Sequence, residues 1–300
     1  MTATTPQSRP WRGVLVATAL PLNHDLSVDY DRFADHCAWL VENGCDGVVP
    51  NGSLGEYQVL TPEERAKVVE TAVAAIGGQR VMPGVAAYGS VEARRWAEQA
   101  RDAGCASVML LPPNAYRADE RSVLAHYAQV AEAGVPVVAY NNPIDTKVDL
   151  VPELLAKLHG EGYIHAVKEF SGDVRRAYRL AELAPALDLL IGADDVLLEL
   201  AVAGAKGWVA GYPNALPAAS VELYHAAVDG DLDTAGKLYR QLHPLLRWDS
   251  KVEFVQAIKL SMDNVGRHGG PVRPPRVPLL PEQEAAVRAA TERAVAAGLA

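Results

Sequence analysis

Helical segments that end in glycine and lead into short β-rich segments recur along most of this chain, mostly about 30 residues apart. One such unit cannot bury its apolar face alone, so neighbouring units have to bring their strands together. The strand-bearing segments span residues 13–22, 41–50, 74–85, 101–113, 131–140, 159–170, 187–195 and 201–213. Eight strands that alternate with helices predict an α/β fold, a closed (β/α)8 (TIM) barrel. An open, doubly wound sheet shows the same alternation and stays an alternative.

Local helix signals agree with this pattern. Glycine stands where a helix end needs a left-handed residue, at Gly44, Gly104, Gly134 and Gly204. Residues 61–64 read Thr-Pro-Glu-Glu, which is typical of a helix start because threonine caps the helix and proline fits its first turn. We therefore expect helix, turn and strand to follow one another in each unit.

The strand signal stops after Pro217, and residues 218–262 are expected to form consecutive helices. A proline-rich stretch at 271–281 then leads to a final helix. We divide the chain into a barrel over residues 1–217, which carries the active site, and a C-terminal helical region over 218–300 that packs on it. This region is expected to cap the barrel or to pack subunits together, without catalytic residues.

Composition limits the possible partners. With 49% hydrophobic and 22% charged residues, the chain is expected to be globular and soluble. A formal net charge of -9, with no cluster of lysine and arginine, argues against a nucleic-acid partner. No stretch approaches the roughly 20 apolar residues that cross a bilayer, so we expect no membrane partner.

Cysteine usage indicates the compartment. Cys37, Cys45 and Cys105 form no CxxC pair, and an odd number gives no disulfide framework, which favours a reducing cytoplasm. The apolar run at 14–20 follows two arginines, as in a signal peptide, but it is short, contains a threonine and ends at Pro21. We assign it to the first barrel strand.

Reactive groups of a barrel lie at the carboxyl ends of its strands, and Lys168 is the strongest candidate there. Ile164, Ala166 and Lys168 share one strand face, and lysine is rarely buried without a partner or a purpose. Burial lowers the pKa of an ammonium group, and only the neutral amine attacks a ketone carbon to form a Schiff base. A lysine that pairs with an acid or extends to solvent is the structural alternative.

Two neighbouring motifs can complete such a site. Tyr140 ends the adjacent strand, about 4.8 Å from that of Lys168, and is a candidate for proton transfer. Taken alone, it equally fits a tyrosine that caps the barrel with its hydroxyl in water. The loop at 52–56, Gly-Ser-Leu-Gly-Glu, can turn successive backbone N–H groups toward a carboxylate or phosphate. Its alternative is a tight turn in which Glu56 caps the next helix.

Other classes of chemistry lack a motif. The eight histidines show no HxH or HExxH spacing, so the sequence predicts no metal site. There is no GxSxG motif for a serine hydrolase and no GxGxxG motif for a dinucleotide. By strand alternation His165 points away from Lys168, and we expect it to be structural.

Three motifs, GSLGE at 52–56, YNNP at 140–143 and VKEFSGD at 167–173, resemble in order the signature of the dihydrodipicolinate synthase and N-acetylneuraminate lyase family. With Ala-Asp-Asp at 193–195 and the helical C-terminal region, the resemblance covers essentially the whole chain. It implies a (β/α)8 barrel that is a homo-oligomer, usually a tetramer, and that needs no metal or other cofactor.

The resemblance also implies roles for single residues. Lys168 forms the Schiff base with a small 2-oxo acid, Tyr140 shuttles protons, and Ser53 with the Leu54 backbone binds the acid's carboxylate. Further positions expected to contact the substrate are Gly52, Asn142, Asp145 and Val209. The iminium draws electrons, so C3 loses a proton and an enamine forms. The enamine then adds to an aldehyde, breaks a carbon–carbon bond in reverse, or expels water or an amine from C4.

Three departures from the family pattern narrow the expected reaction. Leu54 replaces a usual hydroxyl residue, and Asp145 stands where the synthases carry an arginine that holds a substrate carboxylate. The paired tyrosines after the fourth strand are missing, and Tyr116 is the candidate substitute, across a subunit boundary. Since Asp145 repels a second carboxylate, we expect a lyase for a short hydroxylated 2-oxo acid or its cyclic imine, such as a sugar-acid or hydroxyproline catabolite. A true 4-hydroxy-tetrahydrodipicolinate synthase and a catalytically silent metabolite-binding member are the alternatives.

Overall fold

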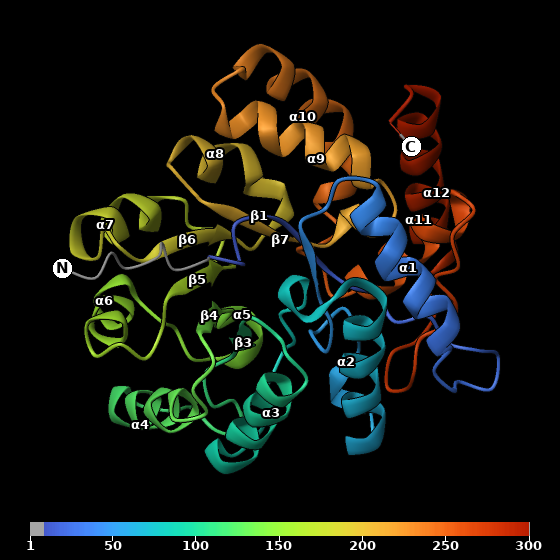
Figure 1. The fold of residues 1–300 in the computed structure, drawn as a ribbon. Helices are drawn as coiled ribbons and strands as arrows, with labels where there is room; N and C mark the ends of the chain where they lie inside the picture. Colours follow the sequence, from blue (N-terminus) through green and yellow to red (C-terminus); the bar gives the residue numbers. More distant parts are fainter. Residues whose placement is uncertain (1–8, 300) are drawn as a thin grey trace.

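The computed structural model describes residues 9–299. Within them, parallel strands form one sheet in the order β2-β1-β7-β6-β5-β4-β3. The strands are β1 (Gly13–Ala17), β2 (Gly47–Val49), β3 (Val108–Leu110), β4 (Val137–Asn141), β5 (Ala166–Glu169), β6 (Asp188–Ile191) and β7 (Gly207–Ala210). Helices surround these strands on the outside (Figure 1).

Residues 81–85, the third strand expected from the sequence, close the sheet between β2 and β3. The backbone N–H of Met82 donates to the carbonyl of Val48 at 2.9 Å, and the N–H of Val85 donates to that of Met109 at 2.9 Å. With this segment the barrel has eight strands. The predicted (β/α)8 fold is therefore confirmed, and the open-sheet alternative is wrong.

The closing segment makes isolated bridges instead of a regular ladder. Pro83 has no N–H to donate, which interrupts the hydrogen bonding of a strand. Gly84 lies against the neighbouring backbone, where a Cβ would sit 2.3 Å from the carbonyl oxygen of Asn51. Both residues were visible in the sequence, but only the packing shows why they stand here.

The outer ring contains long helices that begin and end as the sequence signals indicate. Thr61 and Glu64 form a complete capping box at the start of α2. The four helix-ending glycines have positive φ angles, between 74° and 96°. The helices are α1 (Tyr30–Glu42), α2 (Pro62–Ile76), α3 (Ser90–Asp102), α4 (Glu120–Ala131), α5 (Pro143–Thr146), α6 (Pro152–Gly160), α7 (Arg175–Leu183) and α8 (Leu197–Val202). Short 3-10 turns are η1 (Tyr57–Val59), η2 (Gly78–Arg80), η3 (Asp194–Val196) and η4 (Tyr212–Asn214).

The C-terminal part adds α9 (Pro217–Val228), α10 (Leu232–Leu246), α11 (Phe254–Asn264) and α12 (Pro281–Ala296). Helix α9 contacts α8 and β1 and completes the ring of barrel helices. The boundary expected at 217 therefore falls at the first residue of a barrel helix. Helices α10 to α12 pack on one another beyond it (Figure 1). No helix within residues 9–299 is long and apolar enough to cross a membrane.

The strands are covered on both faces. Every residue from β2 to β7 is buried, because helices lie outside the barrel and side chains fill it. Most of these residues are apolar, so Lys168 and Glu169 at the end of β5 are exceptions that need an explanation.

Candidate active site

A cavity of about 290 Å³ lies at the carboxyl ends of the strands, close to the lower limit of about 300 Å³ for small-molecule sites. Val209 does not line it: this residue is buried within β7, two positions before Gly211, which does. The predicted contact of Val209 with the substrate stays a prediction. The other seven residues predicted for the site all line the cavity: Gly52, Ser53, Leu54, Tyr140, Asn142, Asp145 and Lys168.

Lys168 and Tyr140, the lysine–tyrosine pair, are direct neighbours in the register of β4 and β5. The Lys168 Nζ lies 4.3 Å from the centre of the Tyr140 ring and 5.6 Å from that of Phe170. Burial lowers the pKa of Lys168, and the carboxylates of Asp249 and Asp194 oppose this effect from a distance. Within residues 9–299 the amine has no ion pair or hydrogen bond. The arrangement favours a neutral, nucleophilic amine.

The Tyr140 hydroxyl is held by the residues that follow it. Asn142 Nδ2 donates to the Tyr140 oxygen at 3.3 Å and to Asp145 Oδ2 at 2.8 Å. Burial, followed by the charges of Asp249 and Asp145, raises the pKa of Tyr140 well above its usual value. The hydroxyl therefore keeps its proton at neutral pH and can donate it to a group bound beside Lys168.

The loop after β2 presents backbone groups to the cavity. The N–H groups of Ser53 and Leu54 have no protein acceptor among the described residues. The carbonyl of Ser53 accepts from the N–H of Glu56 at 3.1 Å, which tightens the loop. Two adjacent free N–H groups and the Ser53 hydroxyl suit a bound carboxylate.

Glu56 does not cap the next helix, because Thr61 caps α2. It is buried in a left-handed conformation, with φ of 54°, and binds the C-terminal region instead. Its Oε1 accepts from Lys259 Nζ at 2.8 Å, and its Oε2 accepts from the backbone N–H of Arg273 at 2.9 Å. Arg273 in turn forms a bidentate pair with Glu64 at 2.6 Å. We call Glu56, Lys259, Arg273 and Glu64 the loop clamp.

The C-terminal region also lines the cavity, which sequence reasoning missed. Asp249 and Lys251 come from the turn between α10 and α11, and Arg276 comes from the proline-rich stretch. The region therefore does more than cap the barrel, and the expectation that it supplies no catalytic residue stays a prediction. No periodic pattern marks these residues, since they lie in irregular segments.

Gly192, after β6, leaves room for the lysine. A Cβ at this position would lie 2.4 Å from the carbonyl oxygen of Glu169 and 3.1 Å from Lys168 Cγ. Next to it, buried Asp194 accepts hydrogen bonds from Trp208 Nε1 at 2.9 Å and from the N–H of Tyr212 at 3.0 Å. Gly192 thus makes room for the Lys168 side chain, and Asp194 holds the segment after β6 against Trp208 and Tyr212.

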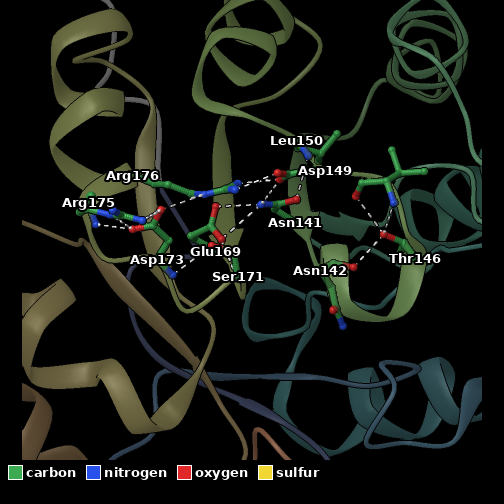
Figure 2. A network of polar contacts seen from close by, with 11 residues as sticks. Asn141, Asn142, Thr146, Asp149, Leu150, Glu169, Ser171, Asp173, Arg175 and Arg176 are labelled. Atoms are coloured by element: carbon green, nitrogen blue, oxygen red, sulfur yellow. Dashed lines mark hydrogen bonds and ion pairs between the residues drawn. The ribbon is translucent and has the colours of Figure 1, made fainter.

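A polar network outside the barrel fixes β4 against β5 (Figure 2). Asn141 Nδ2 donates to Glu169 Oε2 at 2.9 Å, across the two strands. Asn141 Oδ1 accepts from the N–H of Leu150, and Asp149 forms a bidentate pair with Arg176 at 2.6 and 2.8 Å. Successive strand residues face opposite sides, so this network lies behind the lysine–tyrosine pair and holds its register.

Comparison with known proteins agrees with this geometry. The sequence model of the dihydrodipicolinate synthetase family matches residues 10–294. The chain belongs to this family. A 4-hydroxy-tetrahydrodipicolinate synthase of Methanothrix thermoacetophila is 34% identical to this dihydrodipicolinate synthetase-family chain over 281 residues, 93% of this chain and 95% of that protein. The protein of the same name from Neisseria gonorrhoeae is 33% identical over 282 residues, 93% of this chain and 97% of that protein.

Solved structures of the dihydrodipicolinate synthase family share the fold. The dihydrodipicolinate synthase of Aquifex aeolicus is 27% identical with a TM-score of 0.89, covering 96% of this chain and 98% of that one. A prophage protein of E. coli K12 from the same family, in complex with pyruvate, is 25% identical with a TM-score of 0.88, covering 97% and 99%. The family resemblance seen in the three sequence motifs is confirmed.

Proposed function

We propose that the protein is a lyase that forms a Schiff base between Lys168 and a small, pyruvate-like 2-oxo acid. The observation that supports this most is the buried Lys168 amine. It borders the cavity, its pKa is lowered, and it has no protein partner among the described residues. A buried amine in a cavity is a candidate nucleophile, because desolvation favours its uncharged form. Membership of a lyase family and the pyruvate complex of the prophage relative support the same chemistry.

The proposed first step uses three groups. The free N–H groups of Ser53 and Leu54 bind the acid's carboxylate, which places its C2 beside Lys168. The amine adds to C2, and the oxygen of the resulting carbinolamine takes a proton and leaves as water, which gives the iminium. Tyr140 supplies that proton and later recovers one, and loss of a proton from C3 then gives the enamine.

Two candidates remain for the second step. Addition to an aldehyde, as in a 4-hydroxy-tetrahydrodipicolinate synthase, is favoured by the names of the relatives at 30 to 34% identity. Elimination or retro-aldol cleavage of a hydroxylated 2-oxo acid or its cyclic imine is favoured by Asp145, a negative charge in the cavity. The comparisons support the synthase more strongly. The lining cations Lys251 and Arg276 also weaken the argument from repulsion by Asp145.

Trapping the Schiff base tests the proposal. The protein is incubated with pyruvate and borohydride, and the adduct is located by intact mass and peptide mapping. We expect one reduced adduct, on Lys168, that is lost in Lys168→Ala and kept in Lys206→Ala, which removes an exposed lysine. Adduct on another residue, or turnover by Lys168→Ala, would overturn the mechanism.

A substrate panel separates the second steps. One arm supplies pyruvate with aspartate semialdehyde, and the other supplies hydroxylated 2-oxo acids and their cyclic imines. Fast condensation in the first arm establishes the synthase, whereas loss of water, ammonia or an aldehyde in the second establishes the elimination or cleavage reaction. An adduct at Lys168 without turnover in either arm identifies a silent, metabolite-binding member.

A further inference from the structure

Arg276 is a cation of the cavity, and the part of the chain that the structure describes supplies no counter-ion for it. It lies in the proline-rich stretch between α11 and α12, and its side chain is partly buried. Its guanidinium carbon lies 5.3 Å from the centre of the Phe254 ring, which also lines the cavity. Within residues 9–299 the guanidinium takes part in no ion pair or hydrogen bond. Desolvating a charge without pairing it costs free energy, and a bound anion would offset that cost.

The acids around Arg276 do not neutralise it. Burial lowers the pKa of Arg276, whereas the charges of Glu56 and Asp145 act in the opposite direction without touching it. Glu56 already binds Lys259, and Asp145 already accepts from Asn142. The guanidinium is thus free to bind a group that enters the cavity.

Arg276 has a fixed position relative to the carboxylate-binding loop. The loop clamp joins Glu56, at the end of that loop, to the backbone of Arg273, three positions before Arg276. Arg273 is fixed again by its contacts with Glu64 and with the carbonyl oxygens of Leu26 and Val59. Since Ser53, Leu54 and Arg276 line the same cavity, one ligand in it can reach both the free N–H groups of the loop and the guanidinium.

We propose that Arg276 binds a second carboxylate of the substrate, at the end remote from the 2-oxo acid group. This inference rests on the proposed Schiff-base function and names its substrate class as dicarboxylic. The planar guanidinium matches a carboxylate in two parallel hydrogen bonds, and Lys251 adds positive charge to the same cavity. Asp145 also lines the cavity and is negatively charged, as a carboxylate is. It therefore repels a second carboxylate that lies beside it and not beside Arg276.

Two probe acids test this without knowledge of the natural substrate. Borohydride trapping at Lys168 is followed as a function of concentration for 2-oxoglutarate, which has a second carboxylate, and for 2-oxobutyrate, which lacks one. We expect Arg276→Gln to raise the half-saturating concentration of 2-oxoglutarate roughly 10- to 100-fold, the effect of a lost charged hydrogen bond. The half-saturating concentration of 2-oxobutyrate should change by less than about twofold. Arg276→Lys should restore part of the affinity for 2-oxoglutarate.

The controls separate specificity from folding. Arg247→Gln removes an exposed arginine of the same region and should change neither concentration. Equal increases for both acids in Arg276→Gln would show a structural role and overturn the proposal, as would no change for 2-oxoglutarate. If the unaltered protein traps neither acid nor pyruvate, the Schiff-base function itself fails.

Discussion

At the scale of single residues, the reactivity of Lys168 depends on opposing effects on its pKa. Burial among aromatic rings lowers the pKa, and the buried carboxylate of Asp249 raises it. Since only the neutral amine reacts, imine formation should increase with pH until Lys168 is deprotonated and then stay constant. The midpoint of this profile reports the balance between the two effects.

We predict that Asp249→Asn moves this midpoint to lower pH. Removing the carboxylate removes an effect that stabilises the ammonium form, so the pKa of Lys168 falls further. The measurement is the rate of borohydride trapping with pyruvate between pH 5 and 10. Asp229→Asn, on the exposed end of α9, serves as the control. An unchanged or higher midpoint would contradict the role assigned to Asp249.

The Tyr140 hydroxyl is predicted to be needed for turnover. Tyr140→Phe keeps the ring that lies edge-to-face with Phe170 and under the Lys168 amine, and it removes only the hydroxyl. We expect the catalytic rate to fall roughly 10²- to 10⁴-fold, the range of a lost proton-transfer group, while the melting temperature stays close to that of the unaltered protein. Tyr178→Phe, at an exposed tyrosine, should leave the rate unchanged. Full activity of Tyr140→Phe would assign proton transfer to another group.

At the scale of elements, the loop clamp is a buried polar link between the barrel and its C-terminal region. The Lys259 and Glu56 side chains are 2% and 1% exposed, so the ion pair between them is desolvated. Lys259→Met leaves the Glu56 charge buried with fewer partners, and we expect a loss of about 3 to 5 kcal/mol in the free energy of unfolding.

Chemical denaturation measures this loss. The double variant Glu56→Gln with Lys259→Met should be more stable than Lys259→Met alone, because it removes the orphaned charge as well. Lys237→Met, on an exposed position of α10, is the matched control. Equal stabilities of the single and double variants would show that the orphaned Glu56 charge is not the cause of the loss.

Much of the barrel could be predicted because each of its elements carries a local signal. The glycine-ended helices and β-rich segments located all eight strands, and strand alternation placed Lys168 and Tyr140 at neighbouring strand ends. These inferences depend only on residues close in the sequence and on the fixed geometry of parallel strands. The irregular third strand was found for the same reason, although its broken ladder was not.

The contributions of the C-terminal region could not be predicted in the same way. Lys259 and Glu56 are 203 positions apart, and no spacing rule joins them. Arg276 and Lys251 lie in segments without periodicity, whose paths are set by tertiary contacts. The sequence-based argument from Asp145 was incomplete for this reason, since it counted one charge of the cavity and missed the cations beside it.

At the scale of the whole molecule, two buried histidines should make the fold sensitive to acid. His36 joins α1 to Asn214 of η4 at 2.9 Å, and His126 on α4 contacts the Ser90 hydroxyl at 2.9 Å. Burial lowers the pKa of each histidine to about 4, below the unfolded value of 6.5. The unfolded chain therefore binds more protons, and stability falls as the pH drops from about 6.5 toward 4, by roughly 3 kcal/mol per histidine.

Denaturation at a series of pH values measures this slope. His126→Gln keeps a polar group that can contact Ser90 and removes the titration, so its stability should depend less steeply on pH over that window. His24→Gln, on an exposed histidine, should keep the original slope. Identical slopes for His126→Gln and the unaltered protein would contradict the assignment.

A tetramer, with Tyr116 entering a neighbouring cavity, stays a prediction that light scattering checks. Tyr116 is 62% exposed in the single chain.

The order of the chain gives the completed cavity a consequence for protein synthesis. Asp249, Lys251 and Arg276 follow all eight strands, so the ribosome makes the barrel strands before it makes the residues that finish the pocket. A nascent chain that stops before residue 249 carries Lys168 and Tyr140 without their electrostatic surroundings. Substrate recognition would thus begin only after residue 276 has been made, and a copy that stops earlier would carry the nucleophile without the residues that select the substrate.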